Sequence, residues 1–461
     1  MPESTPASAP GPQQPDRVCG SKPSRIEESA LRQWSLVKKF QAVLDEVSPE
    51  VEAHRTEHDP RRTLHRRDYF SLFLLGMFNP VLGSMRALCA ASGLRRTRQA
   101  LGTSPVSLGS FSEAQSLFEP QLLEAVLSRL VADLPAGAAS QIGGVDLACL
   151  RVVDSTLWYV LPRMDWAAWR SGRSGHQQHG VRLHLKYRLA DGVPVAGICS
   201  GGKLCERKAL RQQLKAGEFY IGDRCYGQEY GFLEELDGKG CGYLMRLKQN
   251  QVIVQTQHSR ELSAQDLEAG VCRDEDVVLG RTARYERGPF RLIVVDHAQM
   301  EEPVWLVTNQ TPGQLSAAQV AQLYRRRWEV EGFFRWLKCL LPCRHWLAES
   351  ENGVAIQIYT ALICAVLLTQ RLGRKPSKRL MEMLAFQPCR ACACAALRHT
   401  ASTTAGLRAG AAPEGVAPGL RMPAKSAPWR TAPPCRWPEK RRLSTAMPKN
   451  STASLFSRSK A

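Results

Sequence analysis

Four polar residues recur at helical spacing between Ser316 and Lys338, a stretch that reads SAAQVAQLYRRRWEVEGFFRWLK. Ser316 and Gln319 form an S-x-x-Q capping box, so we expect one helix that begins near Ala317. At 3.6 residues per turn, one narrow stripe of this helix carries Tyr324, Arg327, Glu331 and Lys338. One acid between two cations predicts a track of phosphate contacts with a metal-binding carboxylate in its middle.

A surface helix with an ordinary mixed-charge rim is the alternative interpretation, and for an arbitrary Arg-rich helix it is the more common one. A single glutamate cannot hold two metal ions. The metal-binding hypothesis therefore requires further carboxylates elsewhere in the chain.

Two aspartates follow predicted strands and are the best partners for Glu331. Asp154 follows a buried strand over 150–153, and Asp223 follows a strand over 218–222. The remaining pattern predicts strands over 181–189 and 193–198, a helix over 205–214, a helix over 229–236 and a strand over 242–248. This order is that of a ribonuclease H-like core. An open sheet presents residues to a ligand where its strands end.

Two-metal phosphodiester chemistry needs such a cluster, because hard divalent cations about 3.5 to 4 Å apart take oxygen ligands. We expect Asp154 to bridge two divalent metal ions, with Asp223 on one ion and Glu331 on the other. The spacing of the three acids proves little by itself, so their placement at two strand ends and on one marked helix carries the hypothesis.

The chain divides into four regions by composition and periodicity. We expect residues 1–28, rich in Pro and Ser, to be disordered, and residues 29–135 to form an all-helical DNA-binding domain. Residues 140–386 form the α/β catalytic domain, with a mostly β insertion at about 249–312, and residues 387–461 form a basic tail rich in Pro, Ala and Arg that we expect to be disordered. Arginines make the helical domain suitable for contacts with a DNA backbone, although a solvated bundle with basic edges is about equally compatible.

The net charge of +19 predicts a polyanionic partner, but the tail from Cys389 onward holds 13 Lys and Arg against two Glu. The folded part is thus only moderately basic, and the case for nucleic acid must rest on a site. We predict no membrane span and no signal peptide, and therefore a cytoplasmic protein. The cysteines Cys389, Cys392 and Cys394 lack the partners of a zinc site, as do His176 and His179.

In these motifs the chain resembles the DDE transposases of bacterial insertion sequences, specifically the insertion-sequence-4 family. The signature of that family on the third-acid helix is Y-x2-R-x3-E-x6-K, met here by the four residues of the stripe. VVDSTLWYVLPR from Val152 and GDRCYGQEY from Gly222 are similar to the first and second acid blocks. The similar region covers about 61–386.

The resemblance implies cut-and-paste transposition of a mobile element bounded by inverted repeats. Cleavage at the element end frees a 3′-hydroxyl, which then attacks target DNA, and a homodimer on double-stranded DNA joins the two ends. Asp154, Asp223 and Glu331 would be the ligands of two Mg²⁺ ions, with Mn²⁺ as an expected substitute, and Tyr324, Arg327 and Lys338 would hold phosphates. Weaker candidates for DNA contact are Arg246 and Lys248, and Trp305 is the nearest candidate for stacking on a flipped base. Cys225 and Trp328 are expected to be packing residues.

The family pattern ends after Phe386, and a frameshift near residue 387 is one hypothesis for the change. Two other functions stay open. One is a nuclease of the same fold that cuts without joining. The other is an inactive or domesticated transposase that binds DNA without cleaving it.

Overall fold

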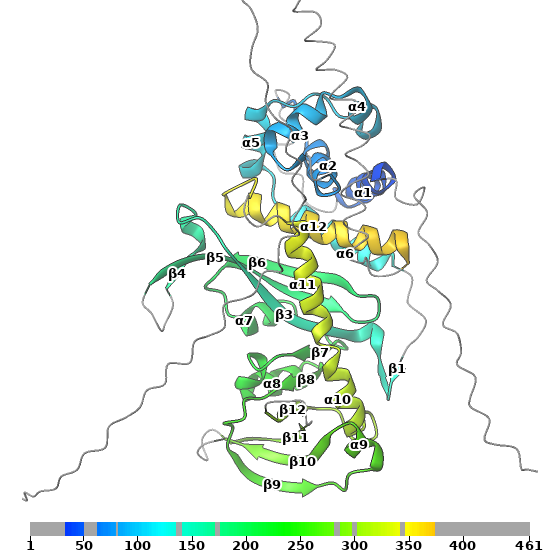
Figure 1. Ribbon diagram of the computed structural model, residues 1–461, viewed down its shortest axis with the longest axis vertical. Helices are drawn as coiled ribbons and strands as arrows, with labels where there is room; N and C mark the ends of the chain where they lie inside the picture. The colour runs from blue at the N-terminus through cyan, green and yellow to red at the C-terminus, as the bar shows by residue number, and fades with distance from the viewer. Residues whose placement is uncertain are drawn as a thin grey trace, which may run out of the picture. The chain divides into compact units, whose positions relative to one another are not determined.

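The computed structural model describes residues 33–49, 62–79, 82–134, 141–170, 176–280, 286–296, 302–341 and 346–373. The predicted disordered segment 1–28, the tail 387–461 and its cysteines lie outside these residues. Within them the chain has a helical N-terminal region and a mixed α/β region (Figure 1).

Aromatic side chains build the core of the N-terminal helices. Tyr69, fully buried, lies with its ring centroid 4.9 Å from that of Phe73 and 4.8 Å from that of Phe111. Such tilted and edge contacts between rings add to the burial of apolar area. The helices are α1 (Gln33–Val47), α2 (Arg66–Met77), α3 (Met85–Ser92), α4 (Arg95–Leu101), α5 (Leu108–Leu117) and α6 (Gln121–Ala132).

One large mixed sheet forms the α/β region. Its order is β4-β5-β3-β7-β8-β12-β11-β10-β9, with β6 paired to β5. β3, β7 and β8 run parallel, whereas the other pairings are antiparallel. A separate small hairpin precedes the sheet. The strands are β1 (Gln141–Ile142), β2 (Val145–Asp146), β3 (Leu150–Tyr159), β4 (Ala168–Arg170), β5 (Gln177–Arg188), β6 (Val193–Gly201), β7 (Phe219–Gly222), β8 (Gly242–Arg246), β9 (Ile253–Ser259), β10 (Val271–Leu279), β11 (Arg287–Val295) and β12 (Val304–Thr308).

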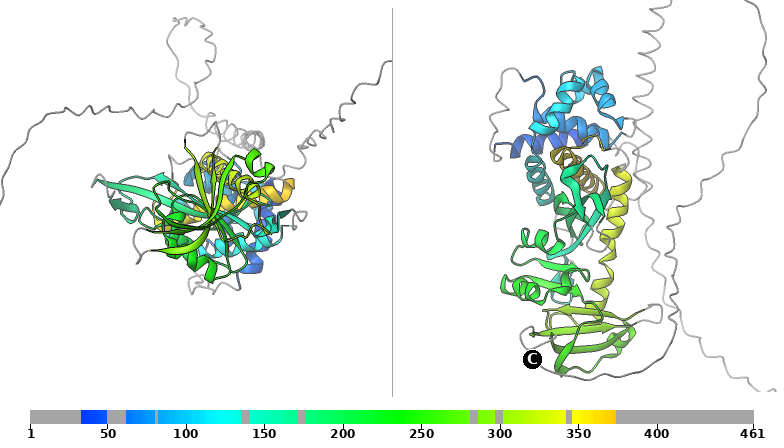
Figure 2. Two further views of the ribbon diagram at one scale, coloured as in Figure 1. Left: turned by 90° about the horizontal axis from the view of Figure 1, so that it is seen from below. Right: turned by 90° about the vertical axis from the view of Figure 1, so that its left-hand side faces the viewer.

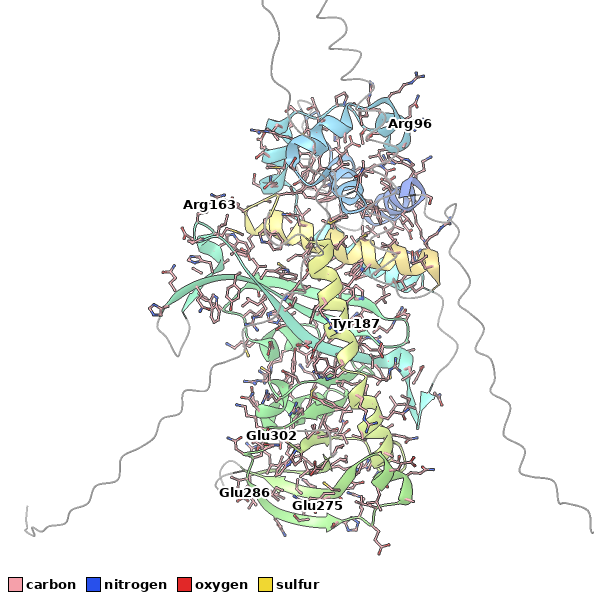
Figure 3. All side chains as sticks on the ribbon, viewed as in Figure 1. Arg96, Arg163, Tyr187, Glu275, Glu286 and Glu302 are labelled. Carbon is pink, nitrogen blue, oxygen red and sulfur yellow. The ribbon has the colours of Figure 1, made fainter. Side chains whose placement is uncertain are left out.

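Helices cover both faces of the parallel strands, because successive strand residues point to opposite faces. Val152 of β3 lies in one core cluster with residues of α10 (Ala317–Arg325), α11 (Trp328–Leu340) and α12 (Glu351–Leu372). Val153, the next residue, lies in a second cluster with residues of α7 (Glu206–Arg211) and α8 (Tyr230–Gly238). Figure 2 shows α10 and α11 along the sheet. At this face Tyr187 of β5 contacts Phe333 of α11, with ring centroids 5.4 Å apart (Figure 3).

The predicted ends of one strand and one helix are wrong. β3 does not end at Asp154 but continues to Tyr159, because its second half pairs with β5 after the pairing with β7 has ended. The single helix expected from Ala317 is two helices, α10 and α11, which meet at Arg326 and Arg327.

The insertion expected at 249–312 is indeed mostly β, with the short helix α9 (Ala264–Glu268) between β9 and β10. β10 begins at Val271, and residues 281–285 lie outside the described residues. β10 carries several charged residues, of which Asp274 is buried against Arg291 of β11.

The insertion is also joined to the signature helices. Asp266 of α9 accepts a hydrogen bond at 2.7 Å from the N–H of Ala318 in the first turn of α10. Arg291 donates to both oxygens of Asp274, at 2.9 and 2.7 Å, and at 2.7 Å to the carbonyl of Leu315, just before α10. The β insertion therefore fixes where α10 begins.

α12 is long and apolar enough to cross a membrane by composition, but 94% of its apolar window is buried inside the structure. It packs against α2, α6 and β6, as the core helix of a soluble protein does. The Tyr359 hydroxyl donates to Glu124 of α6 and lies 2.8 Å from the carbonyl of Gly197 on β6.

Replacing Arg291 by Leu tests the anchoring role of the insertion. The variant leaves Asp274 with only Arg260 and leaves the carbonyl of Leu315 without this donor, so we expect a loss of about 3 kcal/mol or more in the free energy of unfolding. Arg273→Leu, which removes a more exposed pair with Glu275, is the control and should cost less than about 1 kcal/mol. Equal losses in urea unfolding would contradict the assignment.

Candidate active site

The register between β3 and β7 places the first two acids side by side. The last parallel pair of these strands is Val153 with Gly222. An aspartate follows each of these two residues: Asp154 on β3 and Asp223 directly after β7. Two carboxylates thus meet at the point where the parallel pairing ends, as expected for an open sheet.

A tight turn after β7 orients Asp223. Its Oδ1 accepts a hydrogen bond at 2.8 Å from the N–H of Cys225. Gly222 is required before this turn, because a Cβ there would lie 2.6 Å from the sulfur of Met245 and 2.8 Å from the ring of Tyr226. Any side chain at Gly222 would force the side chains of Met245 and Tyr226 to shift.

Arg327 connects the first acid to the third. Its Nη1 donates to Oδ2 of Asp154 at 3.1 Å, and its Nη2 donates to Oε1 of Glu331 at 2.7 Å. The residue is only 9% exposed, and its Nε has no hydrogen-bond partner among the described residues. The guanidinium therefore lies between two of the acids that the sequence predicts to be metal ligands.

The junction of α10 and α11 aims this arginine. The N–H of Arg327 donates to the carbonyl of Tyr324 at 3.0 Å, and the N–H of Val330 donates to the carbonyl of Arg327 at 3.3 Å. Such i to i+3 bonds form a 3₁₀ turn, in which residues three apart are nearly eclipsed. As a result the guanidinium carbon of Arg327 lies 6.0 Å from the ring centroid of Tyr324.

Burial raises the pKa values of both aspartates. The pKa of Asp154 is raised to about 7, chiefly by burial and further by the charges of Asp223 and Glu206, while the N–H of Ser155 and the charge of Arg327 oppose the shift. Burial also raises the pKa of Asp223, against the hydrogen bond from Cys225. Carboxylates with excess negative charge at a strand end favour a bound cation.

A fourth acid, Glu206 at the start of α7, was missed from the sequence. Its Oε1 accepts hydrogen bonds from the Ser155 hydroxyl and, at 2.9 Å, from Nη1 of Arg182. One ligand atom from each of Glu206, Asp223 and Cys225 lies within 4.8 Å of the others. No motif marks Glu206, because it falls inside a predicted helix among ordinary surface residues. Only the pairing of β3 with β5 and β7 brings it to the aspartates.

The remaining predicted residues differ in how near they lie to the acids. Lys338 of α11 places its Nζ 5.9 Å from the ring centroid of Trp158 on β3, so it stays on the side of the strand that carries Asp154. Arg246, the last residue of β8, lies close enough to Tyr324 for its charge to lower the pKa of that phenol, which burial raises overall. Lys248 is exposed just beyond β8, and Trp305 is half-buried in β12 against the second core cluster.

Of the two residues expected to be packing residues, Trp328 is not one. It is 62% exposed at the start of α11, because the break before this helix turns the side chain outward. Its ring centroid is 5.7 Å from the guanidinium carbon of Arg327. Cys225 does pack against the second core cluster, and in addition its N–H donates to Asp223 and its sulfur lies within 4.8 Å of a carboxylate oxygen of Glu206.

Comparisons with known proteins agree with the resemblance seen in the sequence. Residues 146–367 match the family model described as the transposase DDE domain. A curated protein of Geobacillus stearothermophilus, named as a transposase for an insertion sequence element, is 29% identical over 223 residues, which cover 48% of this chain and 55% of that protein. A second curated protein named as a transposase, from Sinorhizobium fredii, is 26% identical over 52% of this chain and 65% of its own length. The chain thus spans 55% of the length of the first relative and 65% of the length of the second.

A solved structure of a piggyBac transposase synaptic complex with hairpin DNA aligns with 77% of this chain and 78% of its own. The sequence identity is 9% and the TM-score is 0.39, which is too low to establish a shared fold. The family match and the curated relatives do not depend on that likeness. Residues 146–367 are thus similar to the transposase DDE domain, and the curated relatives of this chain are named as transposases.

Proposed function

We propose that this chain is the transposase of an insertion sequence, which cuts DNA at the inverted-repeat ends of the element and joins the freed ends to a target by cut-and-paste transposition. The observation that supports the proposal is that two of the predicted acids follow neighbouring parallel strands and that the third shares a hydrogen-bonded arginine with one of them. Asp154 and Asp223 follow the last parallel pair of β3 and β7, and Glu331 reaches Asp154 through the single side chain of Arg327.

The strand order supports a ribonuclease H-like assignment for the catalytic core. The five core strands lie in the order β6-β5-β3-β7-β8, with β6, β5 and β3 antiparallel and β3, β7 and β8 parallel. Helices α7 and α8 lie on one face, and α11 lies on the other. We propose that residues 140–386 form this core with the insertion at 249–312, and that residues 29–135 are the DNA-binding domain.

The donor set fits a hard divalent cation. Asp154, Asp223 and Glu331 offer oxygens. Burial of the charged form raises the pKa values of the two aspartates, and a bound cation would offset the cost of that buried charge. We propose that these three residues hold two Mg²⁺ ions, with Mn²⁺ as a substitute. Bound there, the ions would polarise the phosphoryl oxygens and stabilise the charge that develops during displacement at phosphorus.

The chain's own residues would bind and orient the DNA. Arg327 and Lys338 place positive charge on the same side of β3 as Asp154, and Tyr324 offers a hydroxyl beside Arg327, so these three would contact phosphates at the transposon end. Arg246 and Lys248 would extend the track beyond β8. Two element ends must be joined, so a homodimer on double-stranded DNA, associated with the bacterial nucleoid, completes the proposal.

Arg327 would also act as an internal counter-ion in the free chain. Its guanidinium neutralises Asp154 and Glu331 at hydrogen-bond distance, so a metal ion and the arginine compete for the same carboxylates. A DNA phosphate beside the site would draw the guanidinium away from them. Binding of the transposon end and binding of the metal would then favour each other.

Cleavage of a labelled inverted-repeat end in Mg²⁺ tests the function. We expect the full chain to nick the end and Glu331→Gln to lose nicking by on the order of a hundredfold or more while it still binds DNA, because one metal ligand is removed. Glu329→Gln is the matched control, since Glu329 lies on the same helix but pairs with Arg326 at 2.8 Å. DNA binding without cleavage by the unsubstituted chain would favour an inactive DNA-binding protein, and cleavage without joining would favour a nuclease.

Substitution of Arg327 by Gln tests the counter-ion. Without DNA, we expect the variant to bind Mn²⁺ roughly tenfold more tightly than the unsubstituted chain in isothermal titration, because a unit charge about 4 Å away is worth about 1 kcal/mol or more. The same variant should bind the transposon end more weakly. Arg326→Gln, whose arginine pairs with Glu329, should change neither quantity more than about twofold. An unchanged or weaker affinity of Arg327→Gln for Mn²⁺ would refute the counter-ion.

A further inference from the structure

Glu206 connects the two residues that orient the aspartates. The N–H of Ser155 donates to Oδ1 of Asp154 at 2.8 Å, and the N–H of Cys225 donates to Oδ1 of Asp223 at 2.8 Å. The Ser155 hydroxyl donates to the carboxylate of Glu206, and the thiol of Cys225, whose sulfur lies within 4.8 Å of an oxygen of that carboxylate, lowers the pKa of Glu206. One carboxylate on α7 thus holds both of the residues whose backbone groups fix the aspartates.

Cations keep Glu206 charged and in place. Arg182 of β5 donates from Nη1 to Glu206 at 2.9 Å and also to the Ser155 hydroxyl at 3.2 Å. Burial alone would raise the pKa of Glu206, but the hydrogen bonds from Cys225 and Ser155 and the charge of Arg182 lower it overall. Arg207, the next residue on α7, donates to the carbonyl of Cys225, so α7 holds the turn after β7 at two points.

We propose that Glu206 is a positioning residue for the metal site, which sets the separation and orientation of the Asp154 and Asp223 carboxylates through Ser155 and Cys225. The inference rests on the proposed function, because it assumes that the two aspartates hold a cation. It assigns to α7 a role that neither the family signature nor the strand pattern contains.

The physical need for such a tie follows from the fold. Strand pairing fixes the Cα positions of Val153 and Gly222, but the backbone beyond Gly222 leaves the sheet and turns into α8. A metal site requires ligand positions held to about 0.5 Å, and the groups that orient its ligands typically change affinity by about 10-fold to 100-fold when removed. Glu206 supplies that restraint across the gap between the strand and the turn.

Neutral substitutions separate positioning from charge. Glu206→Ala would weaken cation binding simply by removing a negative charge, whereas Ser155→Ala and Cys225→Ala remove one tether each and leave every charge in place. Cys225→Ser keeps a donor to Glu206. Cys241→Ala is the control, because Cys241 is a buried thiol whose sulfur lies 3.4 Å from the carbonyl of Lys215 instead of beside Glu206.

The experiment measures Mn²⁺ binding to the full chain by isothermal titration, with the melting temperature of each variant recorded beside it. Mn²⁺ suits the test because it prefers oxygen ligands, so the thiol of Cys225 contributes little as a ligand itself. We expect Ser155→Ala and Cys225→Ala each to weaken binding about tenfold, Cys225→Ser to restore it to within about threefold, and Cys241→Ala to leave it unchanged. In Glu206→Ala, a further Cys225→Ala change should have little effect, because its acceptor is already gone.

The inference would be overturned by neutral variants that bind Mn²⁺ within about twofold of the unsubstituted chain, or by a Cys225→Ser variant as weak as Cys225→Ala. An equal loss in Cys241→Ala would do the same, because it would show a general effect of lost thiols. Asp154→Asn distinguishes this failure from failure of the proposed function. If the unsubstituted chain shows no Mn²⁺ binding that Asp154→Asn removes, the metal site itself is wrong and both proposals fall. If it does, only the role of Glu206 is at stake.

Discussion

The parallel pairing of β3 with β7 ends at Val153 and Gly222, and the arrangement of every acid in the site depends on that register. A shift of one residue would move Asp154 to the other face of the sheet, because strand side chains alternate. Gly222 also favours this register, because only a residue without a side chain fits between Met245 and Tyr226. Main-chain hydrogen bonds therefore set the first two carboxylates.

The third carboxylate is placed by a different kind of contact. Glu331 lies on α11. The 3₁₀ turn at Arg327 sets where this helix begins, and packing against β3 and β5 holds it on the sheet. The start of α10 is in turn fixed by Asp266 and Arg291 of the insertion. The insertion between the second and third acids thus contributes to the site without adding an acid to it.

Much of this was predictable from residues whose chemistry depends on local pattern. The stripe of Tyr324, Arg327 and Glu331 was visible because helical spacing is a local property, and Asp154 and Asp223 were visible because each follows a run of strand-forming residues. The family match and the relatives support the transposase assignment that this pattern suggested.

What the sequence concealed depends on contacts between distant segments. The continuation of β3 past Asp154 is decided by β5, and the break before Trp328 has no Pro or Gly to announce it. Glu206 has no local signature at all, because its partners Ser155 and Cys225 lie on other elements. A single sequence carries no record of such pairings, so the orienting groups of a site are harder to predict than the groups they orient.

α12 has a consequence for how the protein is made. This helix packs against α2 and α6, yet it is synthesised after the whole sheet, about two hundred residues later than α6. During translation the apolar faces of α2 and α6 therefore stay without this packing partner until α12 has been synthesised. Domains whose elements pack in order of synthesis have no such interval. Because Tyr359 contacts both α6 and β6, α12 joins the helical region to the sheet. Until α12 is made, the apolar residues of α2, α6 and β6 that pack against it lack this partner.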